Sequence, residues 1–157
     1  MFTTQGLEVL FVACSFLFQL ILIIHFTMRK WHFDLAMRYG RIVYALSIPA
    51  AVISFIILLN GQSWYLWLSG FIYLVWAAYG YWVEYVRRIE WRSPIRWTIF
   101  GPYLTLYLAT VMFYWWPLAQ IYKPLWYGYA VLFVASTILN VTSHQSESQH
   151  VLKEGVI

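Results

Sequence analysis

Charged residues are scarce in this chain. Asp, Glu, Lys and Arg make up 10% of its 157 residues, whereas 62% of the residues are hydrophobic. An ordinary soluble domain carries about 25% charged residues, so this chain cannot cover a water-facing surface and a soluble fold is excluded. Because each helical crossing of a bilayer takes about 20 residues, the length suits one compact membrane domain.

Cysteine is also scarce, and so are ionisable residues in the middle of the long apolar runs. The single cysteine, Cys14, lies inside an apolar run and has no partner for an internal disulfide. No carboxylate, histidine or arginine falls near the middle of a long apolar run, although proton- or cation-coupled transporters usually place one there. The histidines map to one membrane boundary or to the C-terminal tail, so we expect no haem, no metal site and no other cofactor. They are His25, His32, His144 and His150.

Catalytic motifs are missing as well. No nucleophile and base occur at a diagnostic spacing, so we expect no catalytic residues and no enzymatic activity. The formal net charge of +4 comes from basic residues beside apolar runs rather than from a solvated basic patch. We therefore expect the charge to orient the chain in a membrane and not to bind nucleic acid.

Long apolar runs are what the sequence does contain. They predict an all-α, polytopic transmembrane bundle with about five spans, in a single domain over residues 1–142. The expected spans are residues 7–28, 42–59, 64–86, 97–116 and 125–141. The basic stretch before the second span reads as a loop or an interfacial turn. The polar tail, residues 143–157, lacks periodicity and is expected to be mobile.

The distribution of lysine and arginine predicts the orientation. Eight of the ten basic residues follow the first and third spans, and the opposite side carries only Lys123. The positive-inside rule then places the N terminus outside and the C terminus inside, in a plasma (inner) membrane. The motif Asn60-Gly61-Gln62-Ser63 is too short for anything but a tight turn, so the second and third spans should be antiparallel neighbours.

Small and hydroxyl-bearing residues recur at spacings of three and four in every expected span. Such lines mark the faces on which transmembrane helices pack. The second and third spans carry Gly40, Tyr44, Ser47, Ala51, Ser54 and Gly70, Tyr73, Ala77, Gly80, Glu84. We expect these faces to turn inward. The polar and aromatic candidates for ligand binding are Gln19, Tyr73, Glu84, Tyr103, Tyr107 and Tyr114.

The same polar lines have a plainer interpretation. Hydroxyls between transmembrane helices contribute only about 0.6 kcal/mol on average and need not serve a ligand. Glu84 also has two interpretations. In the first, it forms a local ion pair with Arg87 or Arg88, three and four residues later. Alternatively, Glu84 points into the polar line and meets Arg38 or Arg41.

Three functions remain after these exclusions. The leading hypothesis is a non-enzymatic membrane protein that binds a lipid or a small amphiphilic aromatic molecule, or that serves as an accessory subunit of a larger membrane complex. The alternative is a small transporter or channel formed by a homo-oligomer. The lowest-ranked is an intramembrane lipid-modifying enzyme that uses Glu84, His32 and Asp34.

Overall fold

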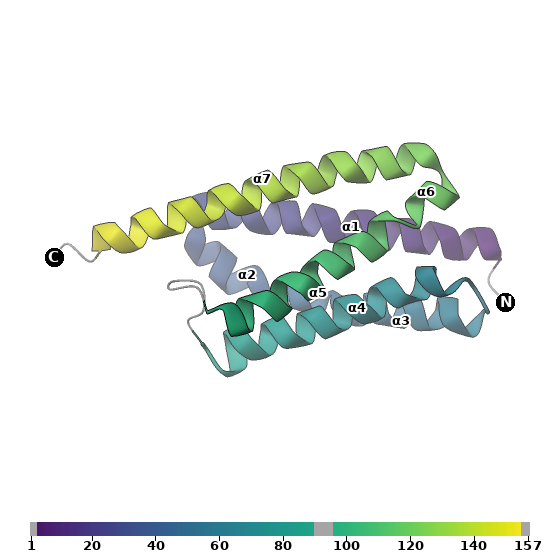
Figure 1. The fold of residues 1–157 in the computed structure, drawn as a ribbon, viewed down its shortest axis with the longest axis horizontal. Coiled ribbons are helices and arrows are strands. Elements are labelled where there is room, and N and C mark those ends of the chain that lie inside the picture. Colours follow the sequence, from purple (N-terminus) through teal and green to yellow (C-terminus); the bar gives the residue numbers. More distant parts are fainter. Residues whose placement is uncertain (1–2, 90–95, 155–157) are drawn as a thin grey trace.

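The computed structural model describes residues 3–89 and 96–154, and every regular element within them is a helix. The long helices run along one elongated bundle, with the two termini at opposite ends (Figure 1). The elements are α1 (Thr4–Trp31), α2 (Phe33–Ala45), α3 (Ser47–Leu59), α4 (Trp64–Tyr81), the π-helix η1 (Trp82–Val86), α5 (Trp97–Trp115), α6 (Leu118–Ile121) and α7 (Lys123–Glu154).

Within the described residues, four helical segments are long and apolar enough to cross a membrane. They are Thr4–Trp31, Arg38–Leu59, Trp64–Val86 and Lys123–Ser143. The expectation of an all-helical chain with several helices able to span a membrane is therefore confirmed. α5 has 19 residues and no charge, but its tyrosines, tryptophans and Pro102 lower its hydropathy and leave it outside this group.

The basic stretch after the first span is not a loop, contrary to the sequence interpretation. α1 ends at Trp31, His32 breaks the helix, and α2 begins at once at Phe33. Leucine, alanine, methionine and arginine in this stretch are good helix formers. The later break, at Leu46, has a local cause, because Pro49 lacks the N–H that would bond the carbonyl four residues earlier.

The α3–α4 hairpin matches the expectation of antiparallel neighbours. Gly61 turns the chain with φ +68°, a backbone conformation that side chains with a Cβ disfavour. The helices then touch at Gly70, where a Cβ would lie 2.6 Å from the Ala50 carbonyl oxygen and 2.2 Å from the Ser54 hydroxyl. The absence of a side chain at Gly70 is thus what allows α3 and α4 to approach.

Gly80 faces Tyr44 of the second span, as its spacing predicted, but it makes room for side chains and not for a helix backbone. A Cβ there would meet the rings of Tyr44 on α2 and Tyr103 on α5, at 2.7 and 3.0 Å, rather than the backbone of α3. Gly80 therefore makes room for two tyrosine rings over α4.

The remaining packing joins the chain's two ends. α7 packs along α1, and α5 crosses obliquely between that pair and the α3–α4 hairpin (Figure 1). The C-terminal tail is helical through Glu154, which its lack of apolar periodicity did not predict.

Basic residues gather at one end of the bundle. α1 and η1 end there and α2 and α5 begin there, whereas the α3–α4 turn and α6 lie at the other end (Figure 1). We call this the basic end; its described residues include Arg29, Lys30, Arg38, Arg87 and Arg96.

Candidate functional site

The polar lines of the helices lie inside the bundle, as their spacing predicted. The buried serine, threonine and glutamine residues of the described bundle are Ser15, Gln19, Ser47, Ser54, Ser69, Thr110, Ser136 and Ser143, and most of them belong to these lines. Most of the hydroxyls bond a carbonyl of their own helix, as Ser15 does with Phe11 and Thr110 with Leu106. Such bonds satisfy a buried hydroxyl locally and leave little polar capacity for a ligand.

Glu84 and two tyrosines form a cluster near the basic end. The Tyr44 hydroxyl donates to Glu84 Oε2 at 2.8 Å, and the Tyr44 and Tyr103 hydroxyl oxygens are 3.5 Å apart. Glu84 lies within η1, a rare helix type that often occurs at functional sites. The cluster joins α2, η1 and α5, so it also ties three elements together.

The arginines near Glu84 have aromatic neighbours. The Arg41 guanidinium lies 5.0 Å from the centroid of the Tyr85 ring, and that of Arg87 lies 5.3 Å from the Trp82 ring. The bond from the Tyr44 hydroxyl shows that the Glu84 carboxylate turns into the polar line, where it meets a phenol.

A second polar group lies near the midpoints of α1, α5 and α7. The Ser136 hydroxyl is 3.3 Å from Gln19 Oε1 and donates to the Phe133 carbonyl at 2.9 Å. The Tyr107 hydroxyl lies beside Ser136, and the Tyr129 hydroxyl lies beside Gln19, without completing a hydrogen bond of ordinary geometry. This group therefore holds buried polar atoms that are only partly satisfied, which is costly in an apolar interior.

Trp76 is the centre of the aromatic core. Its ring is 2% exposed, with centroids 5.6 Å from Tyr103 and Tyr107 and 5.8 Å from Tyr44 and Tyr73. Offset and edge-on aromatic pairs at these distances add to the stability that comes from burial. Because rings occupy the space between α2, α4 and α5, the tyrosine hydroxyls do not converge on one open chamber.

The remaining two candidates, Tyr73 and Tyr114, belong to this core. The Tyr73 hydroxyl donates to the Val43 carbonyl just before the α2–α3 break. The Tyr114 hydroxyl interacts with Ser69, and its ring packs on Phe18. Both phenols thus have partners inside the protein, as the cost of burying an unpaired hydroxyl predicts.

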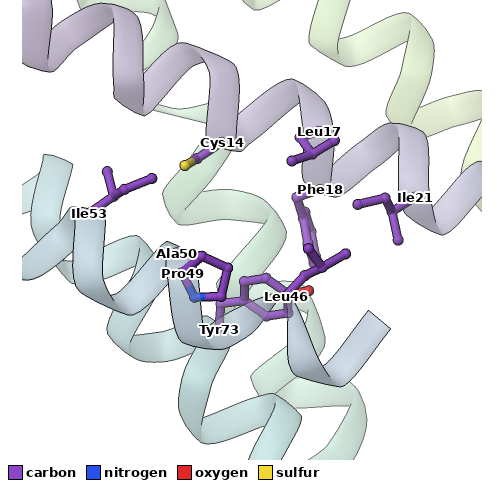
Figure 2. Close-up of a pocket in the computed structure, with 9 residues that line it drawn as sticks. All are labelled: Cys14, Leu17, Phe18, Ile21, Leu46, Pro49, Ala50, Ile53 and Tyr73. Carbon is purple, nitrogen blue, oxygen red and sulfur yellow. The ribbon is translucent and has the colours of Figure 1, made fainter. Parts of the chain in front are cut away.

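A small pocket opens between α1 and α3. Its volume is about 70 Å³, and its walls are apolar except for the Cys14 thiol and the Tyr73 phenol. Figure 2 shows the α1 side chains facing those around the α2–α3 break, with the Tyr73 ring from α4 beside Pro49 and Leu46. The lining residues are Cys14, Leu17, Phe18, Ile21, Leu46, Pro49, Ala50, Ile53 and Tyr73.

The structure thus distributes the six candidate residues over three places. Glu84 and Tyr103 lie near the basic end, Gln19 and Tyr107 lie at mid-length, and Tyr73 and Tyr114 lie in the core. Tyr73 alone among them lines the pocket. Sequence reasoning missed Trp76 and most pocket residues. Trp76 follows Tyr73 by three residues, so it lies on the same helix face, and this spacing could have indicated its burial. No sequence pattern indicated the pocket.

Among the described residues, no group of three histidine, cysteine, aspartate or glutamate side chains could hold a metal ion. The fold places the chain among all-helical proteins with several helices able to span a membrane. No protein-family model, curated protein or solved structure matches the chain.

Proposed function

We propose that the chain is an integral membrane protein of five spans, with the N terminus outside and the C terminus inside. α5 supplies the fifth span: its 19 uncharged residues extend about 28 Å, close to the roughly 30 Å of the hydrocarbon core. Five crossings place the termini on opposite sides, and the two termini lie at opposite ends of the bundle (Figure 1). The positive-inside rule turns the basic end toward the cytoplasm of an inner membrane.

We further propose that the protein binds an apolar ligand, such as a lipid chain, in the pocket between α1 and α3. The pocket carries this proposal, because it has apolar walls and opens between two helices with lipid-facing side chains. Leu17 and Pro49 line it and are themselves exposed. A ligand would therefore enter from the bilayer and not from water.

The size of the pocket limits how the ligand is held. Pockets that enclose a drug-sized ligand measure about 300–1,000 Å³, whereas this one measures about 70 Å³. It suits the end of a hydrocarbon chain or one edge of a ring, while the rest of the ligand lies along the outer surface. The rings around Trp76 occupy the space between α2, α4 and α5, which favours binding at the surface over conduction through a single chain.

Photolabelling tests this function. The purified protein in lipid nanodiscs is exposed to a phospholipid that carries a diazirine at the end of one acyl chain, and adducts are located by mass spectrometry. We expect adducts at the pocket residues of α1 and α3. Ile53→Trp should fill the pocket and remove them.

Ile48→Trp is the matched control, because Ile48 is on the same helix, is 62% exposed and does not line the pocket. It should leave the adducts unchanged. Adducts spread evenly over the lipid-facing surfaces of α5 and α7, or insensitive to Ile53→Trp, would refute binding in the pocket.

A further inference from the structure

The pocket lies halfway along the helices that form it. On α1 it spans Cys14 to Ile21, around the middle of Thr4–Trp31, and on the other side it spans Leu46 to Ile53, around the middle of Arg38–Leu59. In a bilayer, this depth is where the ends of acyl chains meet. A chain end in the pocket therefore belongs to a lipid whose headgroup is about half the hydrocarbon thickness away, roughly 15 Å.

One surface leads from the pocket to the basic end at that distance. Ile42 and Tyr39 precede Leu46 by four and seven residues, so they lie on the same side of the helix. Both are exposed, by 51% and 43%. From the middle of the pocket, at Pro49, to Tyr39 is ten residues, which span at most about 15 Å at 1.5 Å per residue because the helix breaks at Leu46.

A cation is present at the end of that surface. The Arg38 guanidinium lies 5.8 Å from the centroid of the Tyr39 ring, and Arg38 is exposed. An exposed tyrosine beside an arginine suits the headgroup region, where amphipathic rings reside and the guanidinium can bond a phosphate bidentately.

From the pocket toward the other end of the bundle, α1 and α3 present no such cation among the described residues. The α3–α4 turn, Asn60 to Ser63, is uncharged, and the corresponding end of α1 carries the acidic Glu8. Lys123 is at that end but begins α7, across α1 from α3 (Figure 1). Charge complementarity therefore favours the leaflet at the basic end and an anionic headgroup.

We propose that the pocket, Ile42 and the Tyr39–Arg38 pair form one site for an anionic phospholipid of the leaflet at the basic end. The end of one acyl chain occupies the pocket, the chain follows Ile42, and the phosphate bonds Arg38. This inference rests on the proposed function and adds to it the ligand class, the leaflet and the residue that selects the headgroup.

The test compares two photolabile lipids with identical chains, phosphatidylglycerol and phosphatidylcholine, each with a terminal diazirine. One favourable lysine or arginine near a membrane surface contributes about 1 kcal/mol, which is about fivefold in binding. We therefore expect phosphatidylglycerol to label the pocket about fivefold more than phosphatidylcholine. Arg38→Gln should abolish this preference by lowering phosphatidylglycerol labelling more than phosphatidylcholine labelling, because both lipids carry the phosphate but only phosphatidylcholine also carries the choline cation, which Arg38 repels.

Arg96→Gln is the matched control, because Arg96 is another exposed arginine at the basic end but precedes α5. Arg96→Gln should keep the preference for phosphatidylglycerol. If Arg38→Gln and Arg96→Gln lose this preference equally, the Arg38 site is overturned in favour of general surface charge. Equal labelling of the pocket by both lipids, still removed by Ile53→Trp, would overturn the anionic site while the proposed function stands. No labelling of the pocket by either lipid would overturn both.

Discussion

The contact between α3 and α4 gives the sharpest test of the fold. In Gly70→Ala, the new Cβ would lie 2.6 Å from the Ala50 carbonyl oxygen and 2.2 Å from the Ser54 hydroxyl. Ordinary van der Waals contact begins at 3.4 Å, so the helix backbones must separate by about 0.8 Å to relieve the carbonyl contact alone. Overpacking of this kind costs about 1–3 kcal/mol.

Helix propensity acts in the opposite direction, since alanine is favoured over glycine within a helix by about 1 kcal/mol. Gly128→Ala gains the same propensity and serves as the control, because its Cβ would meet Phe16 at an ordinary 3.7 Å. We expect Gly70→Ala to unfold about 1–3 kcal/mol more easily than Gly128→Ala.

A fluorogenic maleimide that reacts with the half-buried Cys14 on unfolding reports the melting temperature in mild detergent. Each kcal/mol should shift the midpoint by about 2–4 °C in a chain of this size. If the melting temperature of Gly70→Ala equals or exceeds that of Gly128→Ala, the close approach of α3 and α4 at this residue is refuted.

Three further predictions concern topology and buried polar groups. In a Cys14→Ser background, an impermeant maleimide added to intact cells should label Gln62→Cys and not Arg88→Cys; labelling of the latter would reverse the proposed orientation. Tyr73→Phe should lower stability by about 1 kcal/mol because the Tyr73 hydroxyl bonds the Val43 carbonyl. Tyr107→Phe should be neutral or stabilising since that hydroxyl completes no bond, and equal melting losses would contradict the difference. Glu84→Gln keeps an acceptor for Tyr44 and Glu84→Leu does not, so Glu84→Leu should be less stable than Glu84→Gln by about 1–3 kcal/mol; equal melting of the two would argue against the bond.

Features encoded locally were predictable from the sequence. Apolar runs, small residues at spacings of three and four, and Asn60-Gly61 indicated the helices, their inward faces and the tight α3–α4 turn. Hydropathy, helical periodicity and turn preference depend on neighbouring residues, so a single sequence suffices for them. The basic stretch after α1 was assigned to a loop or an interfacial turn, although it is helical, because its charges outweighed its helix propensity.

Other features depend on how the helices are rotated and crossed. Trp76 belongs to the core and Trp64 is exposed, yet tryptophans suit a lipid interface and a packed interior equally well. Likewise, the role of Gly80 and the pocket arise where side chains from three different helices meet. Rotating a helix by one residue would replace every such neighbour while leaving its hydropathy unchanged, so only the tertiary structure decided them.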